Sequence, residues 1–431
     1  MKKVITVLTL ATVIPLTYVT SHGDHSFVET LRSDLHGFAD TRIGVRTQND
    51  PDQGDASLGE VRIQLETEQY LGPVTANLRA DLLYDGIENN TNPDLETGHG
   101  WVDLREANLL FSPLPSMDVK LGRQILTWGT GDLLFINDLF PKDFVSFFTG
   151  RDEEYLKAPS DALFISLFHE WANLDLAYTP RFDADRFLSG NRISFFNPMT
   201  GGRIGENNPV LVDPPDTWFS DDEIALRLSR NLGGTELAAY GYHGFWKSPK
   251  GADPTTGSAT FPRLQAFGVS ARTQVGQGIG HAEAGYYDSL DDREGNDPFT
   301  PNSETRLLVG YEQEVVRNLT ASVQYYLEVL MDHDKLVQTL PVGQPLPDED
   351  RHVVTLRLTQ LMWNQNLTLS LFTFYSPSDQ DGYLRPAVSY KVTDNWLLTA
   401  GGNHFFGNQD TTFFGQFDDN SNLYAGTRYS F

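Results

Sequence analysis

The final stretch of the chain, NSNLYAGTRYSF (residues 420–431), ends on an aromatic side chain. Chain ends usually run out into polar residues that few contacts hold in place. Every second position of this stretch is instead apolar, aromatic or small: Leu423, Ala425, Thr427, Tyr429 and Phe431. The residues between them are mostly polar or small. A period of two is typical of a β-strand whose two faces meet different surroundings.

The same alternation recurs along the chain, so the terminal strand is one of many. It is clear in LGEVRIQLETEQY (58–70), VTANLRADLLY (74–84), ETRLLVGYEQE (304–314), LTASVQYYLEVL (319–330) and GYLRPAVSYKV (382–392). These strands would be about 9–12 residues long, which suits a tilted strand that crosses a bilayer. Strands of soluble proteins are usually about five or six residues long. The pattern therefore favours a membrane-spanning β-structure over its alternative, a large secreted β protein.

The composition excludes several other classes of protein. A mean hydropathy of -0.35 is too polar for a helical membrane protein. An aromatic content of 12% is too high for a disordered chain. The chain has no cysteine, which excludes disulfide frameworks, thiolate metal sites and cysteine nucleophiles.

Residues 1–21, MKKVITVLTLATVIPLTYVTS, have the pattern of a secretory signal peptide. Lys2 and Lys3 precede a mostly apolar stretch, and the small residue Ser21 suits a cleavage site. A short membrane anchor or a buried strand is the alternative. We predict a signal peptide at 1–21, a short periplasmic segment at 22–34 and one barrel domain at 35–431.

The connections between strands predict a closed barrel. Short turns alternate with long loops, and aromatic residues gather near strand ends, as in outer-membrane barrels with short periplasmic turns and long extracellular loops. Eight turns and nine loops, with 376–381 among the loops, join eighteen strands. Sixteen is the alternative count, because the strands around 161–168, 174–178 and 236–246 are ambiguous. The sequence thus predicts an all-β, antiparallel, up-and-down transmembrane barrel in the bacterial outer membrane, whose lumen is too wide for side chains alone to fill.

The inward face of this barrel carries many basic residues. Our candidates for the pore lining on the wall are Arg42, Arg62, Arg79, Lys120, Arg306, Arg357 and Arg385. Arg428 belongs to the same face. Rings of charged side chains set the ion preference of a pore. Alternatively, these residues pair with acidic residues of neighbouring strands and only brace the wall.

The stretch KLGRQILTWGTGDLLFINDLFPKDF (120–144) resembles a motif of proteobacterial outer-membrane porin-like proteins, a group distantly similar to the alginate-export porins. The matching residues are Gly122, Arg123, Gln124, Trp128, Gly129, Asn137, Pro141, Lys142 and Asp143. The resemblance implies a porin-type barrel with a functional third loop, and it does not fix a substrate. The chain lacks the dominating run of arginines of the alginate exporters. Arg123 shares the outward parity of Leu121, and we expect a bulge near Gly122 to turn it inward. The alternative is that its side chain snorkels to the membrane interface.

The third loop, near 129–160, is predicted to fold into the lumen and to form its narrowest point. It contains seven phenylalanines and leucines that gain by burial against a wall: Leu133, Leu134, Phe135, Phe140, Phe144, Phe147 and Phe148. Its charged residues would then lie at the constriction: Lys142, Asp143, Arg151, Asp152, Glu153 and Glu154. The alternative is a hydrophobic cap that docks a partner or a neighbouring barrel.

The sequence offers no catalytic site, metal site or cofactor. The ten histidines form neither a readable triad nor a His-x-x-x-His pair. Most acidic residues fall in the long loops, where they either solvate the surface or bind divalent cations near lipopolysaccharide. No ligand set can be named from their spacing.

We therefore predict a porin or channel for passive, substrate-preferring diffusion of small hydrophilic solutes. The alternative is a scaffold or sheath barrel that houses a partner such as a multihaem cytochrome. Expected partners are outer-membrane lipid, lipopolysaccharide and the barrel-assembly machinery, whose recognition signal the terminal Tyr429 and Phe431 resemble. A periplasmic or homo-oligomeric protein partner is a further option, and we expect no nucleic acid.

Overall fold

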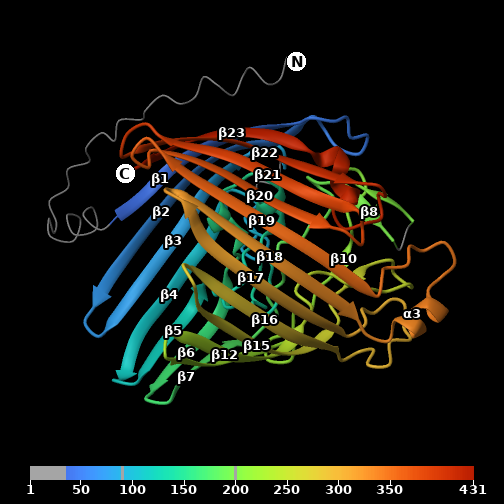
Figure 1. The fold of residues 1–431 in the computed structure, drawn as a ribbon, viewed down its shortest axis with the longest axis horizontal. Coiled ribbons are helices and arrows are strands. Elements are labelled where there is room, and N and C mark those ends of the chain that lie inside the picture. Colours follow the sequence, from blue (N-terminus) through green and yellow to red (C-terminus); the bar gives the residue numbers. More distant parts are fainter. Residues whose placement is uncertain (1–34, 89–91, 199–200) are drawn as a thin grey trace. The chain divides into compact units, whose positions relative to one another are not determined.

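The computed structural model describes residues 35–88, 92–198 and 201–431. The signal peptide and the periplasmic segment predicted at 1–21 and 22–34 lie outside the described residues. Eighteen strands form one antiparallel sheet in which each pairs with the next along the chain, and the last pairs back with the first (Figure 1). The predicted up-and-down barrel is confirmed, with eighteen strands rather than sixteen.

The barrel strands, in chain order, are β1 (Leu35–Arg46), β2 (Ala56–Leu71), β3 (Val74–Asp85), β4 (Val102–Leu114), β5 (Met117–Gln124), β6 (Ser160–His169), β7 (Ala172–Thr179), β11 (Glu223–Leu232), β12 (Thr235–Phe245), β15 (Arg263–Val275), β16 (Gly278–Ser289), β17 (Glu304–Val316), β18 (Leu319–Leu330), β19 (Asp350–Met362), β20 (Leu367–Ser376), β21 (Asp381–Lys391), β22 (Trp396–Gly407) and β23 (Asn422–Ser430). The connections contain the short strands β8 (Phe195–Asn197), β9 (Gly202–Ile204), β10 (Val212–Asp213), β13 (Gly251–Ala252) and β14 (Ala259–Thr260), the helices α2 (Phe144–Thr149) and α3 (His333–Thr339), and the 3-10 helices η2 (Glu153–Leu156) and η3 (Gly415–Asn420).

The alternation of residue types sorts the side chains to the two faces of the wall. In β1, Asp40 and Arg42 are buried on the inward face, whereas Ile43 is 60% exposed on the outward face. In β23, Tyr424 is buried and Leu423 is exposed. Closure pairs the backbone of every strand with two neighbours, so that the wall can lie in lipid without unsatisfied edges. Its apolar outer side chains then suit lipid tails.

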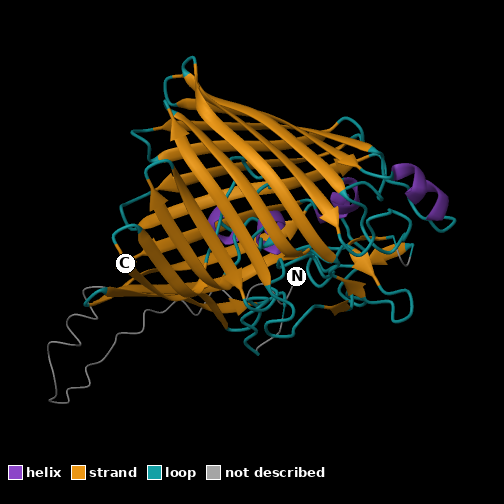
Figure 2. Cartoon of the chain, turned by 90° about the horizontal axis from the view of Figure 1, so that it is seen from below, coloured by secondary structure: helices purple, strands orange, loops and turns teal. Residues whose placement is uncertain are grey.

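Short turns join the strands at one end of the barrel, and longer connections join them at the other. The longest are the third loop, 125–159 between β5 and β6, and the fourth loop, 180–222 between β7 and β11. The prediction of a long loop at 376–381 is wrong. β20 and β21 pair as far as Ser376 and Asp381, which leaves only 377–380 as a turn. Figure 2 shows loops and short helices within the outline of the strands. No helix of the described residues is long and apolar enough to cross a membrane.

The bulge that we expected near Gly122 is absent. Gly122 has a φ of 116°, which suits glycine, but β5 keeps a regular register through Arg123 with both β4 and β6. Arg123 is buried by the loop after β3 instead. Its guanidinium donates to the Leu95 carbonyl (2.6 Å) and to both oxygens of Asp161 (2.9 and 2.7 Å). A residue of outward parity is thus covered by a loop rather than turned into the lumen.

Candidate pore constriction

The acidic tip of the third loop lies against arginines of the barrel wall. Glu153 contacts Arg357 of β19 (3.2 Å) and Arg385 of β21 (3.3 Å) with one carboxylate oxygen. Asp152 pairs with Arg42 of β1 (2.6 Å). Asp152 also pairs with Arg428 of β23, which lies 3.2 Å from Glu154. The third loop therefore reaches from β5 across the lumen to β19, β21 and the closing strands β1 and β23.

Phenylalanines hold the same loop against the wall. Phe147 and Phe148, in and after the first turn of α2, are both buried. The ring of Phe147 lies 5.7 Å from that of Tyr383, and the ring of Phe148 lies 5.4 Å from that of Phe405. Full burial of such a side chain contributes about 1.5–3 kcal/mol. These contacts explain why so many phenylalanines stand in a connection between strands.

Two polar wall residues fix the start of the loop. The buried carboxylate of Glu283 in β16 accepts hydrogen bonds from the backbone of Thr130 and Gly131 (the latter 2.8 Å) and from the side-chain amide of Asn137 (2.8 Å). Gln324 of β18 exchanges two hydrogen bonds with the backbone of Asp132 (2.7 and 2.8 Å). A carboxylate that accepts several N–H donors forms strong charge-assisted bonds. The loop is thereby tied to the wall before it reaches its acidic tip.

Asp132 links this anchor to the basic wall. Its carboxylate binds the guanidinium of Arg357 with two hydrogen bonds (2.6 and 2.9 Å). Bidentate pairing fixes the orientation of an arginine as well as its position. Arg357 is therefore held by Asp132 and presents its remaining donors to Glu153, which is 48% exposed.

A cavity of about 260 Å³ lies between the loop tip and the wall of β19–β23, and charged, hydroxyl-bearing and apolar side chains line it. Its charged lining comprises Arg42, Arg151, Asp152, Glu153, Arg357 and Arg385. Its hydroxyl-bearing lining comprises Thr359, Thr368, Ser370, Ser389, Thr399 and Tyr424. Opposite charges on the two sides of a narrow space act strongly on a dissolved ion, because the effective dielectric constant there is lower than in water.

Other predicted lining residues lie elsewhere. Lys142 and Asp143 are buried inside the third loop, where Lys142 pairs with Asp138 (2.9 Å) and Asp143 caps α2 through the Ser146 N–H (2.7 Å). Neither lines the cavity. Arg306 forms an ion pair with Glu304 (2.6 Å) within the wall.

Arg79 and Lys120 converge on another acidic residue of the wall. Both approach Glu106 (3.5 and 3.8 Å), away from the residues that line the cavity. Arg62 lies beneath the third loop, with its guanidinium 4.1 Å from the centre of the Tyr155 ring. For these residues the bracing alternative describes the contacts better than a place in the pore lining.

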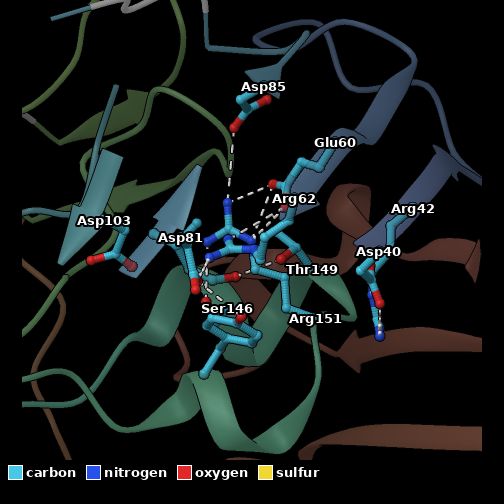
Figure 3. Close-up of polar contacts among 12 residues, drawn as sticks. Asp40, Arg42, Glu60, Arg62, Asp81, Asp85, Asp103, Ser146, Thr149 and Arg151 are labelled. Atoms are coloured by element: carbon cyan, nitrogen blue, oxygen red, sulfur yellow. Dashed lines mark hydrogen bonds and ion pairs between the residues drawn. The ribbon is translucent and has the colours of Figure 1, made fainter. Parts of the chain in front are cut away.

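On the part of the wall that follows β1, the signs are reversed. Figure 3 shows Arg151 of the third loop among acidic residues of the wall. Its guanidinium binds both oxygens of Glu60 in β2 (3.1 and 3.0 Å) and lies 3.8 Å from Asp85 in β3. Here the wall is acidic and the loop is basic, so Arg151 acts as an anchor of the loop although it also borders the cavity.

The fourth loop supplies two arginines that we did not predict. Arg186 binds Asp103 with two hydrogen bonds (2.9 and 2.7 Å), and Arg192 pairs with Asp85 and Glu88. The fourth loop has no period that would reveal these contacts. It does share the mixture of phenylalanines and charges that marks the third loop, and that signal could have found it.

A group of acidic side chains lies where the second and fourth loops meet the barrel. Carboxylate oxygens of Glu96, Asp161 and Asp183 lie within 4.8 Å of one another. Arg123 pairs with Asp161 (2.7 Å) and Arg181 pairs with Glu96 (2.5 Å). These ion pairs offset the charge that would attract a hard cation, and we assign no metal to the group.

No protein-family model and no curated protein matches the chain. Solved structures match its fold. OccAB3 from Acinetobacter baumannii superposes with a TM-score of 0.53 at 11% identity, over 92% of this chain and 98% of that chain. The fold is that of a porin-type barrel. The resemblance to alginate-export porins stays a prediction.

Two further structures match with lower scores. Salmonella typhi OmpF in complex with daunomycin gives a TM-score of 0.44 at 11% identity, over 92% of this chain and 97% of that chain. The outer membrane channel DcaP of Acinetobacter baumannii gives 0.43 at 11% identity, over 92% and 96%.

Proposed function

We propose that this chain is an outer-membrane channel for the passive diffusion of small hydrophilic solutes. One observation carries the proposal: a cavity with charged side chains in its lining lies inside a closed barrel, between Glu153 of the third loop and Arg357 and Arg385 of the wall. A barrel of this size leaves an aqueous path unless something fills it. The third loop narrows that path and lines it with charge.

The charged side chains of the cavity favour selection of solutes by the arrangement of the solutes' own charged groups. Arg357 and Arg385 form a basic edge, and Asp152 and Glu153 form an acidic one. A solute that passes between them has its charged groups drawn to opposite sides, in a space where the field is poorly screened. The preference for substrates follows from this arrangement, without a catalytic step, and we propose no enzymatic activity.

The sheath alternative fits the lumen less well. A folded partner such as a multihaem cytochrome needs the space that the third loop occupies. Phe147 and Phe148 are buried there against β20–β22, and Arg151, only 11% exposed, is paired with Glu60 of β2. Moving the loop aside would expose these aromatic rings and separate a buried ion pair, which is costly. The contacts of the loop therefore favour a channel that needs no partner in its lumen.

The surroundings of the channel follow from its outer face. Exposed apolar side chains suit lipid tails, and we place the protein in the bacterial outer membrane beside lipopolysaccharide. Tyr429 and Phe431 lie at the C-terminal end of β23 with exposed side chains. We propose that the barrel-assembly machinery binds them there before the barrel closes. A homo-oligomeric or periplasmic partner remains compatible with this proposal.

The test is conductance of the purified protein in a planar bilayer. Deletion of residues 133–154 should raise single-channel conductance about severalfold, because the narrowest part of the lumen is removed. A matched deletion of 333–345, which removes the exposed helix α3, should leave conductance unchanged. Both variants must retain the gel shift between unheated and boiled samples that reports a folded barrel. A folded wild-type protein that conducts no ions would overturn the proposed function.

A further inference from the structure

The wall formed by β2, β3 and β4 carries a cluster of carboxylates, which we call the acidic wall. Its members are Glu60, Asp81, Asp85 and Asp103, joined by Glu88 just after β3. Figure 3 shows four of them facing one region of the lumen. Buried carboxylates attract cations strongly unless other charges offset them. Left open, this side of the lumen would be a path for cations.

The wall supplies only part of the offsetting charge. Arg62 of β2 pairs with Asp81, and Arg105 of β4 lies 3.7 Å from Asp103. Arg151 of the third loop binds Glu60 (2.5 Å). The five carboxylates of the acidic wall thus meet only three arginines from the wall and the third loop.

The fourth loop supplies two further arginines. Arg192 is 2% exposed and lies against three carboxylates, namely Asp85, Glu88 (3.3 Å) and Glu60 (3.5 Å). Arg186 is likewise buried and binds both oxygens of Asp103. These two arginines leave few donors free, because Arg192 also donates to the Ser57 carbonyl (3.2 Å).

The backbone of the fourth loop is fixed in this position by the third loop. The Arg186 N–H donates to the Lys142 carbonyl (2.8 Å), and the Phe144 N–H donates to the Arg186 carbonyl (3.0 Å). The Asp185 carboxylate accepts the Lys142 N–H (2.7 Å). The two loops thus form a single inserted unit, and the arginines are held against the acidic wall rather than attached by long flexible side chains alone.

We propose that the fourth loop is a second selectivity element, whose Arg186 and Arg192 neutralise the acidic wall and close that side of the lumen to cations. Permeation is thereby confined to the cavity beside β19–β23. This inference rests on the proposed channel function. It makes Arg186 and Arg192 determinants of specificity although neither lines the cavity.

The experiment compares charge-removing variants within the fourth loop. Arg192→Gln should shift the reversal potential in a salt gradient toward cations, with a rise in the cation-to-anion permeability ratio of about twofold or more. The matched control is Arg181→Gln in the same loop, because Arg181 pairs with Glu96 and touches none of the acidic wall. The control should keep the wild-type ratio.

A double variant separates charge from folding. Arg192→Gln combined with Asp85→Asn removes both members of the ion pair, and it should return the permeability ratio toward the wild-type value. If Arg192→Gln alone does not fold, the same comparison is made with Arg186→Gln and Arg186→Gln/Asp103→Asn. Equal ratios for Arg192→Gln and Arg181→Gln, or no return in the double variant, would overturn the inference.

A second readout does not depend on conduction. Phe187 and Phe195 flank the two arginines, and chymotrypsin should cut there much faster in Arg192→Gln than in the wild-type protein or in Arg181→Gln. If the wild-type protein conducts and responds to changes in the third loop, equal cutting together with an unchanged permeability ratio in Arg192→Gln would refute only the role of the fourth loop. Absence of any wild-type conductance would instead refute the channel function.

Discussion

The backbone of Phe431 lies against the backbone of Gly37. The Phe431 N–H donates to the Gly37 carbonyl (3.0 Å), and the Gly37 N–H donates to the Phe431 carbonyl (3.2 Å). These two bonds extend the ladder between β1 and β23 to the last residue of the chain. The terminal residue therefore takes part in closing the barrel, while its ring stays 49% exposed.

Deletion of Phe431 should reduce insertion into the membrane more than it reduces synthesis. The variant loses both the closing hydrogen bonds and the exposed ring, whereas Phe431→Ala loses only the ring. Quantitative blotting of membrane fractions, with unheated and boiled samples compared, measures the inserted share. Trp363→Ala, at an exposed aromatic of a periplasmic turn, is the control. Equal insertion of the deletion variant and the control would contradict an assembly role for the terminus.

Neutralising the loop tip should make the pore more selective for anions. In Asp152→Asn/Glu153→Gln/Glu154→Gln, the wall arginines lose their acidic partners. The anion-to-cation permeability ratio, measured from the reversal potential in a salt gradient, should therefore rise about twofold. Glu153→Gln alone should give much of the effect, because Glu153 faces both Arg357 and Arg385.

The control for this experiment removes a charge far from the cavity. Asp394→Asn changes a residue that is 98% exposed in the turn between β21 and β22. It should leave the reversal potential unchanged. The same shift in both proteins would mean that total charge, rather than the constriction, sets the preference.

Gly268→Ala should loosen the third loop. A methyl group at Gly268 would collide with the side-chain oxygen of Asn137, and Asn137 is one of the residues bound by Glu283. Such overpacking costs about 1–3 kcal/mol, so the thermal midpoint should fall and single-channel conductance should become noisier. Gly241→Ala, on the neighbouring strand with open space around it, should behave as wild type. Stable, quiet channels in Gly268→Ala would show that the loop is not held at this point.

The stability of the barrel should fall as the pH rises through the titration of Asp183. Burial and the nearby charge of Glu223 raise the pKa of Asp183 to about 8, although Lys247 opposes the shift. The folded pKa lies above the ordinary value of 3.8, so the folded state holds this proton more tightly than the unfolded chain. The resulting stabilisation is full below about pH 4 and is lost as the pH rises toward 8 and beyond.

Asp183→Asn keeps the side chain uncharged and should remove this pH dependence. At pH 8 and above, the variant should be more stable than the wild-type protein, because the wild-type side chain is then charged in its buried position. The measurement is the temperature at which the unheated gel band converts to the boiled form, between pH 5 and pH 9. Asp216→Asn, an exposed residue of the same loop, should keep the wild-type profile. Parallel profiles for Asp183→Asn and the wild type would refute the assignment.

The sequence alone determined the wall of this protein. Period two places Ile43 and Leu423 on one face and Arg42 and Tyr424 on the other, because successive side chains of a strand point to opposite sides. The pattern needs no knowledge of distant contacts. Together with the alternation of short turns and long loops, it predicted a closed barrel of eighteen strands, with sixteen as the alternative. The sequence also predicted that the third loop folds inward, because its many phenylalanines are stabilised by burial against the wall.

Only the tertiary structure decided what fills the lumen. Parity states that a side chain points inward, but not whether it meets solvent or a loop, and so Lys142 and Asp143 were expected at the constriction although both are buried. The partners of Arg192 in β3 and of Arg385 in the third loop are separated from them by more than a hundred residues. Such pairs form because buried charges must be offset wherever the fold brings them together, and loops carry no period from which that meeting can be read.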